Sequence, residues 1–350
     1  MKKILFTLLL IALVFGNYAN AQSEKKGYQT RRKLTKEEDE KLWTELIPKL
    51  GTGSEFSMKE ARQEVVKIGL PVVVHLVSTF NVGNLMVKLD KKDKLMLLQS
   101  NIIDDIREWY QKVYEQHASG ETLGKIKLLI DGSKSDDLGG VTSLVNCRSS
   151  KQILNTVKKI WDTIRDYNKK AKEDKNPILP ELQIFSKLRG QAALAIGEIG
   201  DMTAAEEVAE LVSDDSMYVK MKVLESLGLM GPLVWESVCK KIYPYLFHKN
   251  YKLRTYAWTA LRKLDFRMAI AKLVEKFEEI EKDYKAEKMT TADYLDMKKK
   301  IVDALTGITL KGFSENLNEW KSWMKENSEN DNPLDLENKR SVKGFRSDGS

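Results

Sequence analysis

Apolar residues recur in one five-position pattern, four times, in the C-terminal half of the chain. Within each set the members are separated by four, one, three and three residues. The four sets are Leu188, Ala192, Ala193, Ile196 and Ile199; Val219, Val223, Leu224, Leu227 and Met230; Leu253, Ala257, Trp258, Leu261 and Leu264; and Met297, Ile301, Val302, Leu305 and Ile308. This spacing places all five side chains on one face of an α-helix. We therefore predict four helices, each with an apolar face to bury.

A helix that recurs with the same apolar face cannot bury that face alone, so successive copies are expected to stack. A basic residue follows the first member of every set: Arg189, Lys220, Arg254 and Lys298. The first two copies end at Gly200 and Gly231, where glycine permits the left-handed conformation that terminates many helices. The pattern predicts an all-α fold, an α-solenoid of stacked antiparallel helix pairs.

The N-terminal half repeats this pattern less faithfully. Residues 35–38 form a possible capping box, and residues 37–117 are expected to form a helical region with degenerate repeats. Residues 55–80 look like an atypical terminal repeat, in which Arg62 stands where the other copies are apolar, and Pro71 opens a second helix.

Turn-forming residues interrupt the pattern at 118–150, where an irregular insertion of loop or short strands is expected. In this insertion residues 125–130 and 141–147 are the possible strands. The helical pattern then resumes, and residues 151–325 are expected to form the main repeat array. Its last helix carries Leu317, Trp320 and Met324 on one face, spaced to cover the open end of the stack. Residues 326–350 have the composition of a disordered tail.

The first residues resemble a secretory signal. Lys2 and Lys3 precede an apolar run at 4–15, and Ala19 and Ala21 have the small side chains that signal peptidase reads. We expect cleavage after residue 21, a flexible leader at 22–36, and a protein that is periplasmic or extracellular and not integral to the membrane. A retained N-terminal anchor is the alternative, although the run is short for a span of about 20 residues.

Residues 188–201, LRGQAALAIGEIGD, followed by Asp214 and Asp215 before the next copy, resemble HEAT repeats. In that family an apolar helix carries an early arginine and ends at a glycine, and an Asp-rich turn leads to the next copy. The resemblance covers residues 185–310 well and 55–80 fairly, and it is absent from 118–150. Within this family, the chain is similar to the exported bacterial kind of HEAT (armadillo-like) protein. The resemblance implies a scaffold and indicates no chemistry.

The charge and the cysteines add little to this picture. The formal net charge of +7 comes from acidic and basic residues that alternate along many segments, which is typical of solvated helix faces, so we expect no nucleic acid partner. Cys147 and Cys239 are the only possible disulfide pair. An exported protein can keep a disulfide, but Cys239 lies in an amphipathic helix and is more simply a small buried residue.

No pattern of catalytic or metal-binding residues stands out. His75, His117 and His248 are isolated, and no phosphate loop or nucleophile motif is present. We therefore expect no catalytic residue, no metal site and no cofactor. Asp214 and Asp215 are better interpreted as a helix-entry turn than as a catalytic pair.

Aromatic residues gather in the second and third copies, and tyrosine is enriched at binding hot spots. Tyr218, Tyr245, Tyr251 and Lys241, near the repeat ends, are the expected binding residues. The leading hypothesis is a non-enzymatic scaffold that binds a protein or peptide. An envelope enzyme or ligand carrier with its site at 118–150, and a structural module of an envelope assembly, are the alternatives. The oligomeric state does not follow from the pattern.

Overall fold

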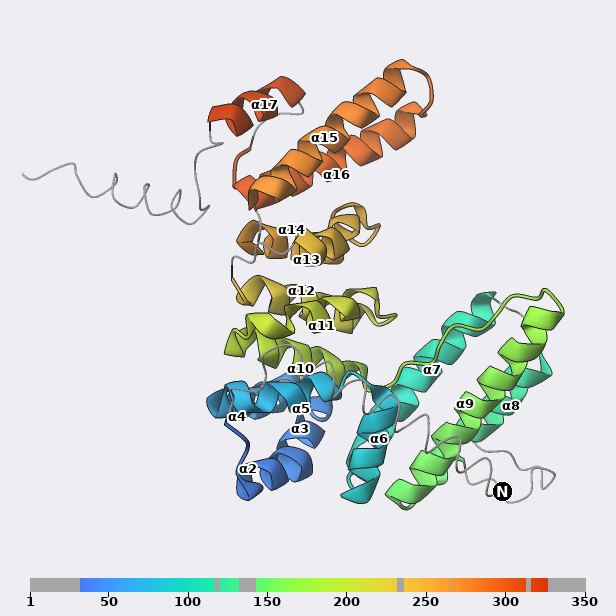
Figure 1. Ribbon diagram of the computed structural model, residues 1–350. Coiled ribbons are helices and arrows are strands. Elements are labelled where there is room, and N and C mark those ends of the chain that lie inside the picture. Colours follow the sequence, from blue (N-terminus) through green and yellow to red (C-terminus); the bar gives the residue numbers. More distant parts are fainter. Residues whose placement is uncertain are drawn as a thin grey trace, which may run out of the picture. The chain divides into compact units, whose positions relative to one another are not determined.

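The computed structural model describes residues 32–116, 120–131, 143–231, 236–264, 266–312 and 316–326. These residues form helices and connecting turns without any β-strand, so the expected all-α fold is confirmed (Figure 1). The expected signal peptide and almost all of the expected C-terminal tail lie outside the described residues, as does most of the leader. The chain divides into two units: unit 1 comprises Met1–Ile199 and Asp214–Val219, and unit 2 comprises Gly200–Ser213 and Lys220–Ser350.

Unit 1 contains helices from both the N-terminal region and the first clear repeat. They are α2 (Lys36–Lys41), α3 (Ile47–Gly51), α4 (Glu55–Ile68), α5 (Val73–Ser78), α6 (Val82–Lys91), α7 (Gln99–Gln116), α8 (Glu121–Asp131), α9 (Ser150–Glu173) and α10 (Ser186–Ile199), with a π-helical stretch, η2 (Leu42–Leu46), between α2 and α3. Short 3-10 turns are η3 (Leu70–Val72), η4 (Leu95–Leu98) and η6 (Leu144–Asn146).

The start of α2 is fixed by the capping box that the sequence predicts. The Thr35 side chain accepts a hydrogen bond from the Glu38 amide, and the Glu38 carboxylate accepts one from the Thr35 amide. A carboxylate at this place satisfies amide groups that have no partner inside the helix. The same carboxylate binds Arg32, and these contacts lower the pKa of Glu38 to about 2.

The apolar side of α10 is covered by α3, α4 and α5, whereas α9 packs against α6 and α8 (Figure 1). The contact with α3 is close because Gly51 has no side chain: a Cβ there would lie 3.1 Å from the Cβ of Leu188. The expected repeat helix at 55–68 and the turn that Pro71 opens are both present as α4 and η3.

The expectation of loop or short strands at 118–150 is wrong for residues 125–130, which belong to helix α8. Residues 143–149 form a loop that contains the 3-10 turn η6, as the loop alternative predicts. Gly120 precedes α8, but Gly124, a residue type typical of turns, lies inside it, because Leu123, Ile126, Leu129 and Ile130 form a buried helical face. Residues 132–142 lie outside the described part of the chain.

Unit 2 is built of shorter helices followed by a long pair. They are α11 (Ala205–Glu210), α13 (Glu236–Ile242), α14 (Tyr251–Leu264), α15 (Phe266–Lys285), α16 (Thr291–Thr309) and α17 (Leu317–Glu326), with 3-10 turns η7 (Met202–Ala204), η8 (Leu211–Ser213) and η9 (Tyr243–Phe247). Helix α12 (Met217–Leu229) contributes residues to both units. In unit 2 elements close in sequence pack together: α13 on α11, α14 on η9 and α13, and α16 on α14 and α15.

The recurring apolar sets face the interior, as predicted. Every member of the second and third sets is buried. Ile199 in the first set and Met297 and Val302 in the fourth are half-buried. The buried face of α16 keeps Ile301, Leu305 and Ile308 from the set and adds Ala304 and Thr309, so the fourth copy follows the shared pattern only in part.

Two glycines have the backbone conformation that the sequence predicts. Gly200 and Gly231 have φ values of +75° and +86°, which lie in the region where a side chain is strained. A third glycine, Gly307 on α16, allows close approach, because a Cβ there would lie 2.7 Å from the indole ring of Trp258.

Helix α17 packs on α15, as a terminal helix with one apolar face would. Leu317 and Trp320 are buried as expected, but the third buried residue is Trp323, and the expected Met324 is half-buried.

Among the described residues, no single helix combines the length and the apolar composition that a membrane span needs. The segment Leu70–Ser78 followed by Val82–Lys91 meets both conditions only as a pair, and the pair is bent by 106°.

Candidate interaction surface

Tyr218, the first of the expected binding residues, belongs to a polar network in unit 1. Its hydroxyl accepts a hydrogen bond of 2.5 Å from the Gln191 amide and donates one of 3.4 Å to the Glu55 carboxylate. Burial raises the pKa of Tyr218 to about 12. The hydroxyl is therefore committed to contacts inside unit 1 and holds its proton at neutral pH.

The same network explains Arg62, which occupies an otherwise apolar repeat position. Its Nε lies 2.9 Å from the Glu198 carboxylate, and its Nη1 donates to the Gln191 side chain. Arg62 is buried, so these contacts supply the partners that a buried guanidinium needs. Arg62 thus joins α4 to α10 in place of an apolar contact.

Arg189, the basic residue of the first set, is also buried with a carboxylate. Its side chain is 1% exposed, and its Nη1 binds Asp214, which is 3% exposed. Its Nε donates to the carbonyl of Ile184 at 3.1 Å. The other Asp214 oxygen accepts from the Ser216 amide at 2.8 Å, which is the helix-entry turn that the sequence predicts.

Lys241 and Tyr245 lie in unit 2, where both are attached to the segment around α11. Lys241 Nζ lies 2.6 Å from the Glu210 carboxylate, and the Tyr245 hydroxyl donates to the Val212 carbonyl at 2.5 Å. Tyr245 is half-buried, so the hydroxyl is fixed while part of the ring remains accessible. Lys241 is paired with Glu210, which leaves less of its charge for a partner.

The Tyr245 ring contacts the side chains of Lys220 and His248. Lys220 Nζ is 5.8 Å from its centroid, a cation–π distance, and the His248 ring stacks on it with centroids 6.0 Å apart and planes at 25°. From the sequence alone, Lys220 is identified only as the basic residue of the second set, and His248 as an isolated histidine.

Tyr251 follows at the start of α14, and 59% of its surface is exposed. Arg254 lies over its ring, with Cζ 5.4 Å from the centroid, and the ring meets Trp258 edge-on at 5.9 Å. Arg254 Nη1 donates to the carbonyls of His248 and Lys249, at 2.8 and 3.2 Å. Arg254 therefore connects the Tyr251 ring to the backbone of the turn that carries His248.

We call these six residues the basic–aromatic surface: Lys220, Tyr245, His248, Lys249, Tyr251 and Arg254. Within the described part of the chain, no carboxylate forms an ion pair with Lys220, Lys249 or Arg254. The pKa of His248 is lowered by burial and by the positive charges of Lys220, Lys249 and Arg254. The surface is therefore a site of uncompensated positive charge.

Two of the four expected binding residues, Tyr245 and Tyr251, belong to the basic–aromatic surface. Lys241 lies beside it in sequence and is ion-paired, whereas Tyr218 belongs to the network of unit 1. Sequence reasoning missed Lys220 and Arg254 as binding residues. The signal was present, because both follow the first member of their sets.

The described ranges contain neither a metal-binding cluster nor a disulfide. No group of three or more His, Cys, Asp or Glu residues there has the geometry to hold a metal ion. Cys147 and Cys239 are both buried thiols, so no disulfide joins them in the structure. Burial raises the pKa of Cys147, and its Sγ lies 3.4 Å from the Ser143 carbonyl.

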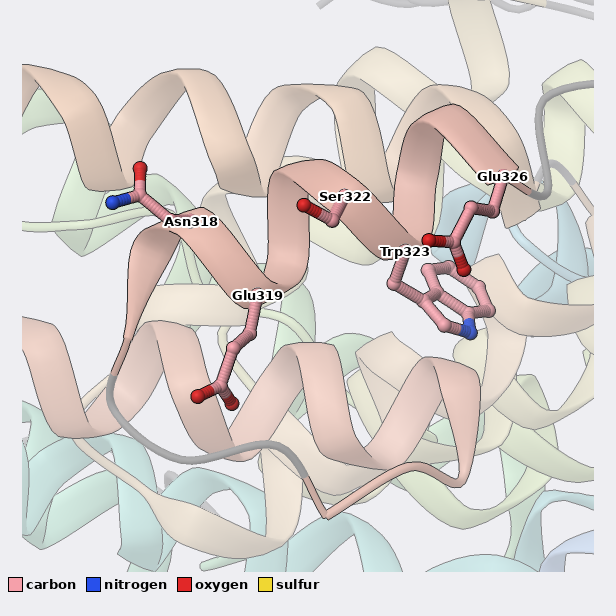
Figure 2. A pocket seen from close by; sticks show the side chains of 5 residues that line it. All are labelled: Asn318, Glu319, Ser322, Trp323 and Glu326. Atoms are coloured by element: carbon pink, nitrogen blue, oxygen red, sulfur yellow. The ribbon is translucent and has the colours of Figure 1, made fainter.

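A shallow pocket of about 320 Å³ lies on α17. Its described lining residues are Asn318, Glu319, Ser322, Trp323 and Glu326. Figure 2 shows that all five side chains come from this one helix. One helix face does not surround a small molecule as a ligand site does, so the pocket gives no functional assignment.

No family model matches the chain, and no curated protein or solved structure matches it significantly.

Proposed function

We propose that the protein is an exported HEAT-like scaffold that binds a protein or peptide partner through the basic–aromatic surface. The observation that carries the proposal is the pair of Tyr245 and Tyr251 beside cations that form no ion pair with a carboxylate of the described residues. Tyrosine and arginine are the residues that most often dominate protein interfaces.

The recurring helices support the scaffold part of the proposal. Their shared apolar face is buried between neighbouring elements in unit 2, as it is when each repeat covers the next. Gly200 and Gly231 end their helices in the same conformation, and Lys220 and Arg254 occupy the same repeat position. Export rests on the N-terminal sequence alone and is tested by fractionating cells that produce the full chain.

Site-specific crosslinking tests the binding role. A photoreactive phenylalanine analogue replaces Tyr251 in the full chain, in the cells that naturally produce it, and a matched variant carries it at Tyr114. Tyr114 is 50% exposed and belongs to unit 1. We expect a discrete crosslinked protein from position 251 and none from position 114. No crosslink from either position across growth conditions would contradict the proposal.

A further inference from the structure

The positive charge and the exposed aromatic ring of the basic–aromatic surface favour some protein partners over others. We propose that it binds an acidic polypeptide segment, in which at least two Asp or Glu side chains are flanked by apolar ones. This inference rests on the proposed binding function and specifies the chemistry of the partner.

Charge complementarity gives the first argument. Lys220, Lys249 and Arg254 surround one turn, and no described carboxylate pairs with any of them. Their combined effect on His248 disfavours a further positive charge there. A carboxylate placed at this turn would relieve the repulsion among the three cations.

The half-buried His248 ring offers a hydrogen-bond donor, which gives the second argument. His248 Nδ1 accepts from the Asn250 amide at 3.1 Å, so in the neutral ring the proton is on Nε2. A histidine in this form offers a neutral donor, which a carboxylate oxygen accepts.

The size of the surface distinguishes a peptide from a long polyanion. Only three cations are clustered here. The positive surface is bounded by Glu210, whose side chain is 73% exposed and which lies two residues before Val212, the residue whose carbonyl binds the Tyr245 hydroxyl. Nucleic acid binding needs a stripe of basic residues that follows many phosphates. The exposed Tyr251 ring instead offers a flat apolar contact for the side chains next to a carboxylate.

Fluorescence anisotropy with the full chain tests this assignment. The probe is a short fluorescein-labelled peptide of alternating Glu and Leu, and the control probe has Gln in place of every Glu. We expect the acidic peptide to bind at least about tenfold more tightly than the amide peptide, and added salt to weaken it. Equal binding of the two peptides would overturn the proposal.

Variants locate the binding site. Lys220→Gln with Lys249→Gln is expected to weaken binding about tenfold or more, and the exposed Lys249→Gln alone several-fold. Lys299→Gln removes the same charge from an exposed position on α16 and should leave affinity within about twofold. Circular dichroism establishes that each variant is folded. Loss of affinity in Lys299→Gln as large as in the double variant would place binding elsewhere and refute the assignment.

The remaining outcomes separate the inference from the proposed function. Tighter binding of a single-stranded oligonucleotide than of the acidic peptide would overturn the peptide assignment. A tenfold gain in affinity after removal of 327–350, which carry Glu329, Asp331, Asp335 and Glu337, would make the chain's own C-terminal segment the occupant. If the crosslink from position 251 persists in the double Lys variant, the acidic preference fails while the binding function stands. If the wild-type chain gives no crosslink, the function itself fails.

Discussion

Arg189 in unit 1 and Arg254 in unit 2 occupy the same position of the recurring pattern, yet their charges have different surroundings. Both are buried, and both reach back to backbone carbonyls that precede their helices, Arg189 to Ile184 and Arg254 to His248. Arg189 also pairs with the buried Asp214. Arg254 forms no ion pair with any carboxylate that the structure describes, and it lies over the ring of Tyr251.

This difference shows how a repeat position can keep its structural role and change its electrostatic one. In unit 1 the guanidinium charge is neutralised inside the fold, where it fixes contacts between helices. In unit 2 the backbone contacts are the same in kind, but no carboxylate of the described residues neutralises the guanidinium charge. The charge of Arg254 therefore adds to the positive potential at the turn that carries His248.

The largest effect that this comparison predicts comes from one substitution made at both positions. Arg189→Met leaves the Asp214 carboxylate buried without its cation, which should lower the free energy of unfolding by about 3–5 kcal/mol. Arg254→Met strands no carboxylate and should cost about 1–2 kcal/mol. Urea denaturation, with hydrogen exchange to resolve α10 from α14, measures both.

Arg189→Met combined with Asp214→Asn supplies the control for this prediction, because the Asn amide oxygen can still accept from the Ser216 amide. Replacing both members of a buried ion pair removes the stranded charge, so most of the lost stability should return. Equal losses in Arg189→Met and Arg254→Met would mean that the carboxylate does not distinguish the two positions.

A smaller change in stability is expected from Gly→Ala at a crowded glycine of unit 2 and at an open glycine of unit 1. Gly307→Ala places a Cβ 2.7 Å from the Trp258 indole, and overpacking of this kind costs about 1–3 kcal/mol. Gly124→Ala meets nothing within 4 Å on the exposed side of α8, and should stabilise by about 0.5–1 kcal/mol. Thermal unfolding measures whether each substitution raises or lowers the stability. A stabilising Gly307→Ala would show that α14 and α16 can move apart at no cost.

The smallest effect concerns the polar network of unit 1 and depends on pH. Burial raises the pKa of Tyr218 from 10.0 to about 12, so its contribution to stability is complete below pH 10 and is lost as the pH rises through about 12. Across this interval the unfolded chain releases the phenol proton before the folded chain does. Urea midpoints should therefore fall more steeply with pH for the wild type than for Tyr218→Phe. Parallel curves would mean that Tyr218 titrates normally.

The periodic part of the fold could be predicted from the sequence because its signal is local. The apolar sets on α12 and α14 specify buried faces with one helical period, and Gly200 and Gly231 mark the ends of helices. The capping box at Thr35 is likewise contained within four residues. Short-range patterns of this kind determine which residues form a helix and which side is buried.

Contacts between residues far apart in the sequence could not be predicted in the same way. Arg62 was interpreted as a defect of a terminal repeat, because nothing near it indicates that Gln191 and Glu198 bind it. Gly124 made a turn the simpler prediction where α8 is found, because the apolar face of that helix overrides the preference of glycine for turns. Of the basic–aromatic surface, the tyrosines could be suggested from composition. That no described carboxylate pairs with Arg254 is a property of three-dimensional packing.

The contact between Arg62 and Glu198 also has a consequence for the order in which the chain matures. The two residues are separated by 136 positions, so α4 cannot acquire its ionic partner until α10 has been synthesised. During that interval the guanidinium and its apolar surroundings are open to solvent and to chaperones. Unit 2 joins elements that are neighbours along the chain, and it can assemble piece by piece as each helix emerges.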